Sequence, residues 1–202
     1  MYLKKINLKN KVALVTGAGK GIGRACSIAL AEAGATIIGV SRTASDLDKL
    51  QKDIKKVKGK LIKITCDIMD YEDLSSKLKK IKKVDILVNN AGTNIPEPFE
   101  KIKQTSMNYL VDLNMKAAFN VAQIVVLKML KNKKKGGSII NMSSQLGHVG
   151  LPGRNIYNMT KFGIEGLTKG MGVELATKNI SCLLYTSPSP RDRVLSRMPS
   201  SA

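Results

Sequence analysis

The stretch "TGAGKGIG", at residues 16–23, follows the apolar run "VALV" and carries four glycines at alternate positions. Ordering a glycine costs more backbone entropy than ordering any other residue. A loop this rich in glycine therefore indicates a backbone that must approach a bulky group. The first candidate for that group is a phosphate, bound by backbone N–H groups at the start of a helix.

Two common phosphate-binding patterns are absent from the chain. No Gly-Lys-Ser/Thr follows a glycine at the P-loop distance, and the pattern G-x-G-x-x-G lacks its third glycine. What remains is T-G-x-x-x-G-x-G, with Thr16 closing a strand and Gly17, Gly21 and Gly23 in register. This spacing predicts a tight turn and then a helix whose first N–H groups face a pyrophosphate. A plain strand–helix turn is the alternative.

Short β-branched runs alternate with longer helical patterns along the chain. The expected strands are residues 12–15, 36–40, 61–65, 86–88 and 138–142, and the expected helices are residues 21–33, 45–56, 71–81, 106–130 and 156–177. The strands are apolar throughout, which is typical of burial on both faces. The sequence therefore predicts an α/β fold, a doubly wound parallel sheet (Rossmann-like), in a single domain over residues 1–180.

Composition excludes several classes of protein. No apolar run reaches the roughly 18 residues that a membrane span needs, and the start "MYLKKINLKNK" has no apolar stretch typical of a secretory signal. The cysteines Cys26, Cys66 and Cys182 are widely spaced, which argues against a zinc site or a disulfide framework and suits a reducing cytosol. We expect a cytoplasmic protein with no bound metal and no membrane association.

The formal net charge is +19, from 34 Lys+Arg against 15 Asp+Glu. The lysines cluster in "LKNK", "KKVKGK", "KKIKK" and "KNKKK", each just before a strand-like run. In a parallel sheet these positions share one edge, opposite the carboxyl edge where ligands bind. The clusters are interpreted as solvated surface, and no nucleic-acid binding is expected. The alternative is an acidic partner, nucleic acid included.

Further motifs follow the glycine loop in order. "NNAG" occupies residues 89–92, Asn114 lies in the long helix, "SS" ends the fifth strand, and "YNMTK" contains Tyr157 and Lys161. With these motifs the chain resembles the short-chain dehydrogenase/reductase family, from about Lys11 to about Ile180. The resemblance implies an oxidoreductase that reduces a carbonyl, or oxidises a secondary alcohol, of a small molecule with a nicotinamide cofactor.

The expected catalytic residues are Ser144, Tyr157, Lys161 and Asn114. Tyr157 and Lys161 are four residues apart and share one helix face. A neighbouring ammonium lowers the phenol pKa from its ordinary value near 10. The resemblance implies that Tyr157 exchanges a proton with the substrate oxygen, while Lys161 lowers the pKa of Tyr157 and holds the ribose.

The resemblance also implies that Ser144, selected by its spacing from Tyr157, polarises the substrate oxygen and that Ser143 supports the turn. Asn114 would kink the long helix and hold a water. Without these companions, the Tyr–Lys pair would be an ordinary surface pair.

The end of the second strand indicates the cofactor. NAD-specific folds place an acidic residue there, but this chain has Ser41 and Arg42, and Lys20 adds a second cation from the glycine loop. Because a guanidinium suits a phosphate, we expect NADP(H) rather than NAD(H). The alternative is that Arg42 is a surface residue in a promiscuous enzyme. The cofactor contacts implied by the resemblance are Thr16, Gly17, Lys20, Gly21, Ile22, Gly23, Ser41, Arg42, Asp67, Ile68, Asn90, Ala91, Gly92, Tyr157 and Lys161.

The sequence also suggests candidate substrate contacts and a candidate subunit interface. Thr93 and Asn94 are candidate substrate contacts, with an ordinary loop as the alternative. His148 is interpreted as a solvated loop histidine rather than a substrate contact. The resemblance implies a homodimer or tetramer built on the helices after Ser106 and Ile156. The apolar residues that could form this interface are Phe162, Ile164, Leu167 and Met171. The alternative is that they pack inside the core of the domain.

The composition changes after Ile180, where "SCLLYTSPSPRDRVLSRMPSSA" gathers three arginines within seven residues. The Pro-Gly signature of the family is absent. We expect residues 181–202 to be a disordered tail of foreign origin, and the family's last strands and substrate lid to be missing.

Three functions compete. The leading one is NADP(H)-dependent reduction of a 3-oxoacyl thioester or interconversion of a sugar or polyol. The second is a catalytically inactive, truncated nucleotide-binding scaffold, and the third is a basic nucleic-acid binder.

Overall fold

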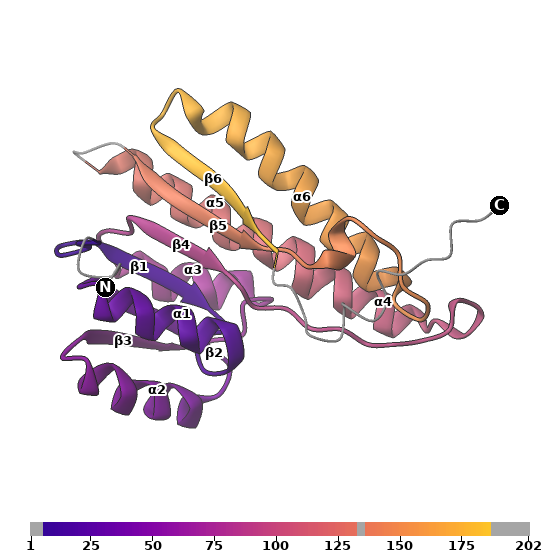
Figure 1. The fold of residues 1–202 in the computed structure, drawn as a ribbon, viewed down its shortest axis with the longest axis horizontal. Helices are drawn as coiled ribbons and strands as arrows, with labels where there is room; N and C mark the ends of the chain where they lie inside the picture. The colour runs from indigo at the N-terminus through magenta and orange to yellow at the C-terminus, as the bar shows by residue number, and fades with distance from the viewer. Residues whose placement is uncertain (1–5, 133–135, 187–202) are drawn as a thin grey trace.

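The computed structural model describes residues 6–132 and 136–186. Strands and helices alternate through this part of the chain (Figure 1). The strands are β1 (Val12–Thr16), β2 (Thr36–Ser41), β3 (Lys60–Thr65), β4 (Ile86–Asn89), β5 (Gly137–Met142) and β6 (Ile180–Tyr185). The helices are α1 (Gly21–Glu32), α2 (Ala44–Lys56), α3 (Tyr71–Lys79), α4 (Gln104–Val111), α5 (Ala117–Lys131) and α6 (Asn155–Ala176), with short turns η2 (Phe99–Lys101), η3 (Asp112–Lys116) and η4 (Gln145–Gly147).

All strand pairs are parallel, in the order β3-β2-β1-β4-β5-β6. The order reverses direction at β1, so the chain winds outward first through β2 and β3 and then through β4, β5 and β6. This confirms the predicted doubly wound parallel sheet. It also places the ends of β1 and β4 side by side at the carboxyl edge, where such folds bind ligands.

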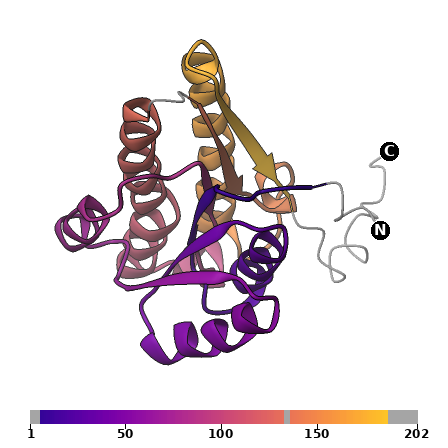
Figure 2. The ribbon, with the colours of Figure 1, turned by 90° about the vertical axis from the view of Figure 1, so that its left-hand side faces the viewer.

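The sheet is packed on both faces. One core cluster joins alternate strand residues such as Leu14 and Leu87 to α3, α5 and the end of α6. The other joins Ala13 and Val15 to α1 and α2, and the helices on the two sides are visible in Figure 2. Strands β1, β2 and β4 are buried almost throughout, as expected, whereas the edge strand β3 is largely exposed.

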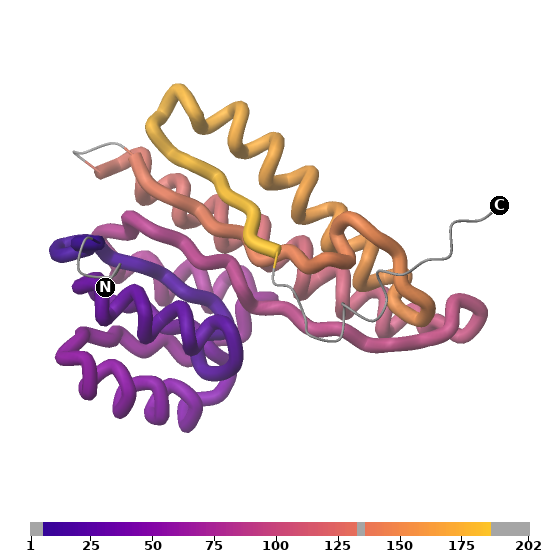
Figure 3. The backbone as a smooth tube through the Cα atoms, viewed as in Figure 1, coloured from indigo at the N-terminus to yellow at the C-terminus, as the bar shows by residue number. Residues whose placement is uncertain are grey.

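Strand β6 corrects the predicted domain boundary. It pairs with β5 from Gly137↔Ile180 to Met142↔Tyr185, so residues 181–185 belong to the sheet rather than to a tail, and the sixth strand is present (Figure 3). The physical reason is alternation: Ile180 and Cys182 pack on the core, while Leu183 and Tyr185 point to the opposite, exposed face. The part of the predicted tail at residues 187–202 lies outside the described residues.

One helical rod, residues 104–131, is long and apolar enough to cross a membrane by length and composition. Half of its most apolar window is buried inside the domain, where Val121, Val125 and Met129 are fully buried in the core. Its apolar character is therefore used in packing against the sheet.

Candidate active site

Most of the predicted cofactor residues, together with Tyr157 and Lys161, line one cleft at the carboxyl edge of the sheet, with a volume of about 620 Å³. Thr16, Gly23, Asn114 and Ser144 are not among its lining residues. The predicted residues that line it are Gly17, Lys20, Gly21, Ile22, Ser41, Arg42, Asp67, Ile68, Asn90, Ala91, Gly92, Tyr157 and Lys161. Thr93 and Asn94, the candidate substrate contacts, line it as well. The cleft therefore runs from the glycine loop to α6.

The glycine loop has the geometry that its spacing predicted. Gly17 and Gly21 take positive φ angles of 64° and 52°, which favour glycine. A Cβ on Gly23 would overlap the Gly17 carbonyl oxygen and lie 2.5 Å from Asn90 Nδ2. Helix α1 begins at Gly21, and within the described chain its first turn has neither an acidic residue nor a side-chain cap. Its first N–H groups thus donate no hydrogen bond to a capping side chain and meet no charge from an acidic residue of the same turn.

Thr16 and Asn90 have a structural part in the cleft. Thr16 Oγ1 accepts hydrogen bonds from the backbone N–H groups of Asn90 (2.9 Å) and Ala91 (3.0 Å). Asn90 Nδ2 donates back to the Thr16 carbonyl at 3.0 Å. Thr16 is fully buried, so this reciprocal contact locks the ends of β1 and β4 together beneath the loop.

The end of β2 carries cations already in contact with acidic groups. Arg42 lies 3.8 Å from Asp67 and donates to the Tyr109 hydroxyl at 3.2 Å. Lys20 pairs with Asp46 at 3.1 Å. The Lys20 and Arg42 side chains are 79% and 57% exposed, but Asp46 is only 7% exposed whereas Asp67 is 36% exposed. The Arg42–Asp67 pair is therefore the weak one, and Arg42 can turn toward an anion in the cleft.

Helix α6 brings Tyr157 and Lys161 to the other end of the cleft. Lys161 Nζ lies 5.5 Å from the centre of the Tyr157 ring and donates to the Met142 carbonyl at 2.7 Å. Only 7% of Lys161 is exposed, and burial lowers the pKa of its ammonium to about 8. The predicted side-by-side placement of phenol and ammonium is present, in a setting that makes the lysine an unusually ready proton donor.

Asn114 lies at a π-turn, η3, between α4 and α5. Its side chain accepts from the Thr93 N–H at 2.9 Å, and donates to the Thr93 carbonyl at 2.9 Å and to Thr160 Oγ1 at 3.2 Å. One amide thus joins the long helix, the loop after β4 and helix α6. A π-turn in a helix commonly marks a functional position.

The two serines after β5 have different contacts. Ser144 Oγ accepts from the Leu146 N–H at 3.2 Å and caps the turn η4. Ser143, which lines the cleft, donates to Glu165 Oε1 at 3.0 Å. Ser143 thus supports the turn through α6, and the choice of Ser144 as the substrate contact stays a prediction.

Comparisons with known proteins agree with this geometry. The short chain dehydrogenase family matches residues 11–188. The chain belongs to this family. It is 35% identical over 179 residues to the 3-oxoacyl-[acyl-carrier-protein] reductase FabG of Thermotoga maritima, covering 87% of this chain and 72% of that protein. It is 37% identical over 175 residues to the L-xylulose reductase of Mesocricetus auratus, covering 87% and 70%.

Similar proteins differ in the cofactor that their names give. "Carbonyl reductase [NADPH] 2" of Sus scrofa is 36% identical over 176 residues, covering 87% of this chain and 70% of that protein. The crystal structure of carveol dehydrogenase from Mycobacterium avium in complex with NAD superposes with a TM-score of 0.83 at 27% identity, covering 88% and 70%. This short-chain dehydrogenase is therefore an oxidoreductase acting on CH–OH or carbonyl groups, in a family that uses NAD(P)(H).

Several contacts in this short-chain dehydrogenase escaped the sequence analysis. Glu165, one turn after Lys161, holds Ser143 and also lies 3.2 Å from His148 Nε2. Its spacing from Lys161 was the available signal. Ile164, expected as an interface residue or as core, is 3% exposed and lies in the core, whereas Phe162 is 51% exposed.

Proposed function

We propose that this chain binds NADP(H) along the cleft and exchanges a proton between Tyr157 and the oxygen of a small-molecule carbonyl or secondary alcohol. The observation that supports this best is the continuity of the cleft. One cavity is lined by Arg42 and Asp67, by the start of α1, and by Tyr157 and Lys161. A dinucleotide spanning it would place its adenosine near Arg42 and Asp67, its pyrophosphate at the start of α1 and its nicotinamide beside Tyr157.

The residues present suit a pyrophosphate at the glycine loop. A Cβ on Gly21 would point into open space, so nothing in the described chain crowds the loop there. Helix α1 offers its N–H groups and its positive dipole end to an anion. Asp67 and Ile68, at the carboxyl edge beyond β3, line the same cleft and are proposed to contact the adenine.

The preference for NADP(H) rests on charge. Position 41 is a serine, so no acidic side chain ends β2 to bind ribose hydroxyls or to repel a 2′-phosphate. Arg42 and Lys20 line the cleft together with Ser41. Arg42 is 57% exposed and lies 3.8 Å from the 36% exposed Asp67, so this ion pair costs little to exchange for a phosphate.

We assign a role in proton transfer or hydrogen bonding to each of the four candidate catalytic residues. When bound, the cofactor supplies the hydride. Tyr157 would donate its phenolic proton to the carbonyl oxygen as the carbon is reduced, and remove it in the reverse direction. Lys161 would stabilise the phenolate and, with its pKa near 8, return a proton to it. Ser144 would donate a hydrogen bond to the same oxygen, and Asn114 would hold a water beside Lys161.

Two substrate classes are proposed, each after a named relative: a 3-oxoacyl thioester, and a sugar or polyol such as L-xylulose. The proposal also includes a cytoplasmic location and a homodimer or tetramer. Exposed apolar side chains on α5 and α6 support the assembly, among them Phe119, Leu127 and Phe162.

The test of this function measures NADPH oxidation by the full chain with L-xylulose and, separately, with an acetoacetyl thioester. Tyr157→Phe removes only the hydroxyl, so we expect turnover to fall by about 10²- to 10⁴-fold while NADPH still raises the unfolding midpoint. Turnover that survives in Tyr157→Phe would contradict the assignment. NADPH binding without any turnover in the wild type would instead favour the inactive scaffold.

Cofactor preference is tested by thermal unfolding with saturating NADPH or NADH. At a hundredfold excess over Kd, a ligand stabilises the native state by about 2.7 kcal/mol. We expect the larger shift with NADPH, and we expect Arg42→Ala to reduce that shift without changing the one with NADH. Lys169→Ala, an exposed cation on α6, is the matched control. Equal shifts with both cofactors in the wild type would refute the preference.

A further inference from the structure

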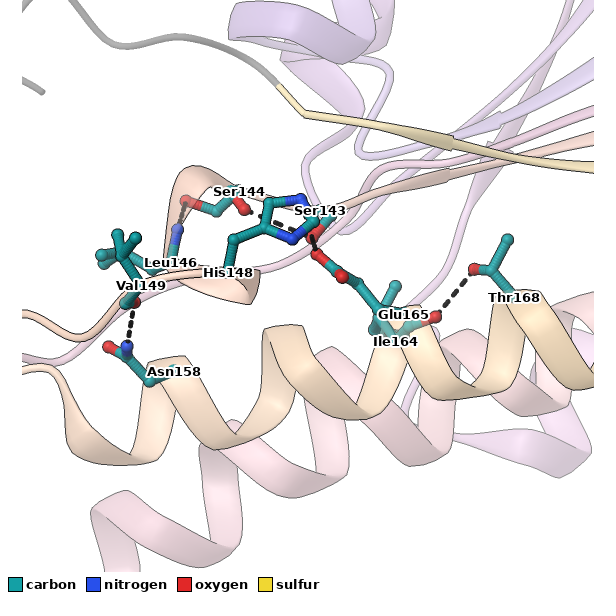
Figure 4. A network of polar contacts seen from close by, with 9 residues as sticks. All are labelled: Ser143, Ser144, Leu146, His148, Val149, Asn158, Ile164, Glu165 and Thr168. Carbon is teal, nitrogen blue, oxygen red and sulfur yellow. Dashed lines mark hydrogen bonds and ion pairs between the residues drawn. The ribbon is translucent and has the colours of Figure 1, made fainter.

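A buried carboxylate lies beneath the segment that carries Ser144. Glu165 is 6% exposed, and its Oε1 receives a hydrogen bond from Ser143 Oγ at 3.0 Å. The same oxygen lies 3.2 Å from His148 Nε2. Figure 4 shows both contacts reaching Glu165 from the two ends of residues 143–148.

The segment wraps this carboxylate closely. A Cβ on Gly147 would overlap Glu165 Oε1 and lie 2.6 Å from Ser143 Oγ, so only a glycine fits between them. A second contact from α6 closes the far end, where Asn158 Nδ2 donates to the Val149 carbonyl at 2.6 Å. Residues 143–149 are thus held from α6 at both ends.

Glu165 is the middle member of a polar row on α6. One turn before it, Lys161 donates to the Met142 carbonyl at 2.7 Å, and about one turn after it Thr168 Oγ1 accepts from Asn141 Nδ2 at 2.9 Å. Three successive residues at the end of β5 therefore meet three successive turns of α6. This row fixes the position of α6, which carries Tyr157, against the strand that leads into Ser144.

Burying a carboxylate is costly unless hydrogen bonds replace its water. An ionised carboxylate only accepts hydrogen bonds. Ser143 Oγ donates one to Glu165, and His148 Nε2 lies within ion-pair distance of the same oxygen. Ser144 Oγ meanwhile accepts from the Leu146 N–H, which leaves its own hydrogen available to donate to a bound group. An apolar side chain at position 165 could fill the space but could not impose this arrangement.

We propose that Glu165 is a positioning residue: by holding Ser143 and His148 it fixes Ser144 relative to Tyr157 for contact with the substrate oxygen. The proposal rests on the proposed function. Glu165 itself touches neither substrate nor cofactor. Its effect is on the orientation of a hydrogen-bond donor, and misplacing such a group by about 1 Å can cost roughly 10²-fold in rate.

The experiment compares Glu165→Leu and Glu165→Gln with the wild-type full chain, using NADPH and either test substrate. Glu174→Leu, at an exposed position on the same helix, is the matched control. We expect Glu165→Leu to lower kcat by about 10²-fold. We expect Glu165→Gln, which keeps an acceptor oxygen for Ser143, to lower it by about tenfold. The unfolding-midpoint shift with NADPH and the activity of Glu174→Leu should be unchanged.

A double-mutant cycle shows whether Glu165 acts through Ser144. If it does, Glu165→Leu combined with Ser144→Ala will be no slower than Ser144→Ala alone, because both changes remove the same interaction. Additive losses in kcat, or kcat values for both Glu165 variants within about twofold of wild type, would overturn the proposal.

Hydrogen exchange separates this proposal from the proposed function. The Gly147 and His148 N–H groups donate within the turn to Ser144 and Gln145 carbonyls. Their exchange should be faster in Glu165→Leu and Glu165→Gln than in Glu174→Leu. If the wild-type chain turns over neither substrate, the proposed function fails. In that case, faster exchange confined to this segment would still show that Glu165 fixes residues 143–148. Unchanged exchange would overturn the proposal for Glu165 as well.

Discussion

At the scale of single residues, Lys161 is a cation that is costly to bury. Burial lowers the pKa of its ammonium from 10.5 to about 8. The pKa of this ammonium is lower in the folded state than in the unfolded state. Above pH 10.5 Lys161 is neutral in both states and does not destabilise the fold, and this advantage is lost as the pH falls through about 8. At neutral pH the native state therefore bears the cost of a buried cation, which is offset in part by its bond to the Met142 carbonyl.

Lys161→Met should consequently stabilise the chain at neutral pH. Removing the buried charge and losing one hydrogen bond gives a net gain of roughly 2 kcal/mol, or a rise in Tm of about 4–8 °C. The advantage should disappear above pH 10.5, where the wild-type lysine is neutral in both states. Thermal unfolding at the two pH values checks this, with Lys169→Met as the control. A Tm below that of the wild type at neutral pH would show that Lys161 is not costly to bury.

At the scale of elements, α6 contains four glycines, whose substitution should have different effects. Gly166 is exposed, and a Cβ there would meet nothing in the described chain within 4 Å. We expect Gly166→Ala to raise the free energy of unfolding by about 0.5–1 kcal/mol, because alanine loses less backbone entropy in a helix. Gly163 instead faces Met115, whose Cε would lie 2.5 Å from a new Cβ.

Gly163→Ala should therefore gain less than Gly166→Ala, or lose stability, depending on how far the flexible Met115 side chain retreats. Chemical denaturation of the two variants gives the comparison directly. Equal gains would show that α6 and the π-turn are not in tight contact. Asn114 lies in the same contact between η3 and α6, where it donates to Thr160. Packing between these two elements therefore also affects the position of a candidate site residue.

At the scale of the whole molecule, the charge distribution follows from the parallel sheet. The starts of all six strands share one edge, where the described lysines gather around residues 9–11, 58–60 and 79–83. Few acidic groups lie there to neutralise them. Lys83 has a partner in Asp85, at 3.1 Å. The cleft lies at the opposite, carboxyl edge, as expected for a parallel sheet.

With a formal net charge of +19, repulsion should destabilise the folded chain at low ionic strength. Adding sodium chloride from about 0.01 M to about 0.15 M shortens the Debye length from about 30 to 8 Å. We expect Tm to rise by about 2–4 °C, equivalent to about 1 kcal/mol. Repeating the scan with a second monovalent salt separates screening from binding of a particular anion. A Tm that falls with salt would mean that attractive ion pairs outweigh the repulsion.

The sequence alone determined much of this protein. Five strands, five helical regions and the carboxyl-edge site followed from hydrophobic period and from glycine and motif spacing, since these patterns depend on neighbours along the chain. The positive φ of Gly17 and the shared face of Tyr157 and Lys161 are local properties of the same kind. They required no knowledge of how the elements pack.

Tertiary structure alone decided the rest. The segment that begins at Ile180 became a strand because β5 offers it an open edge to pair with. Its short alternation of inward and outward residues gains meaning only beside that edge. Likewise, Ser143 and Glu165 are 22 residues apart and meet only because α6 packs on β5 in one register. Contacts between distant residues depend on that packing, whereas the elements depend on local order, and this is why the sequence predicted the fold more completely than the site.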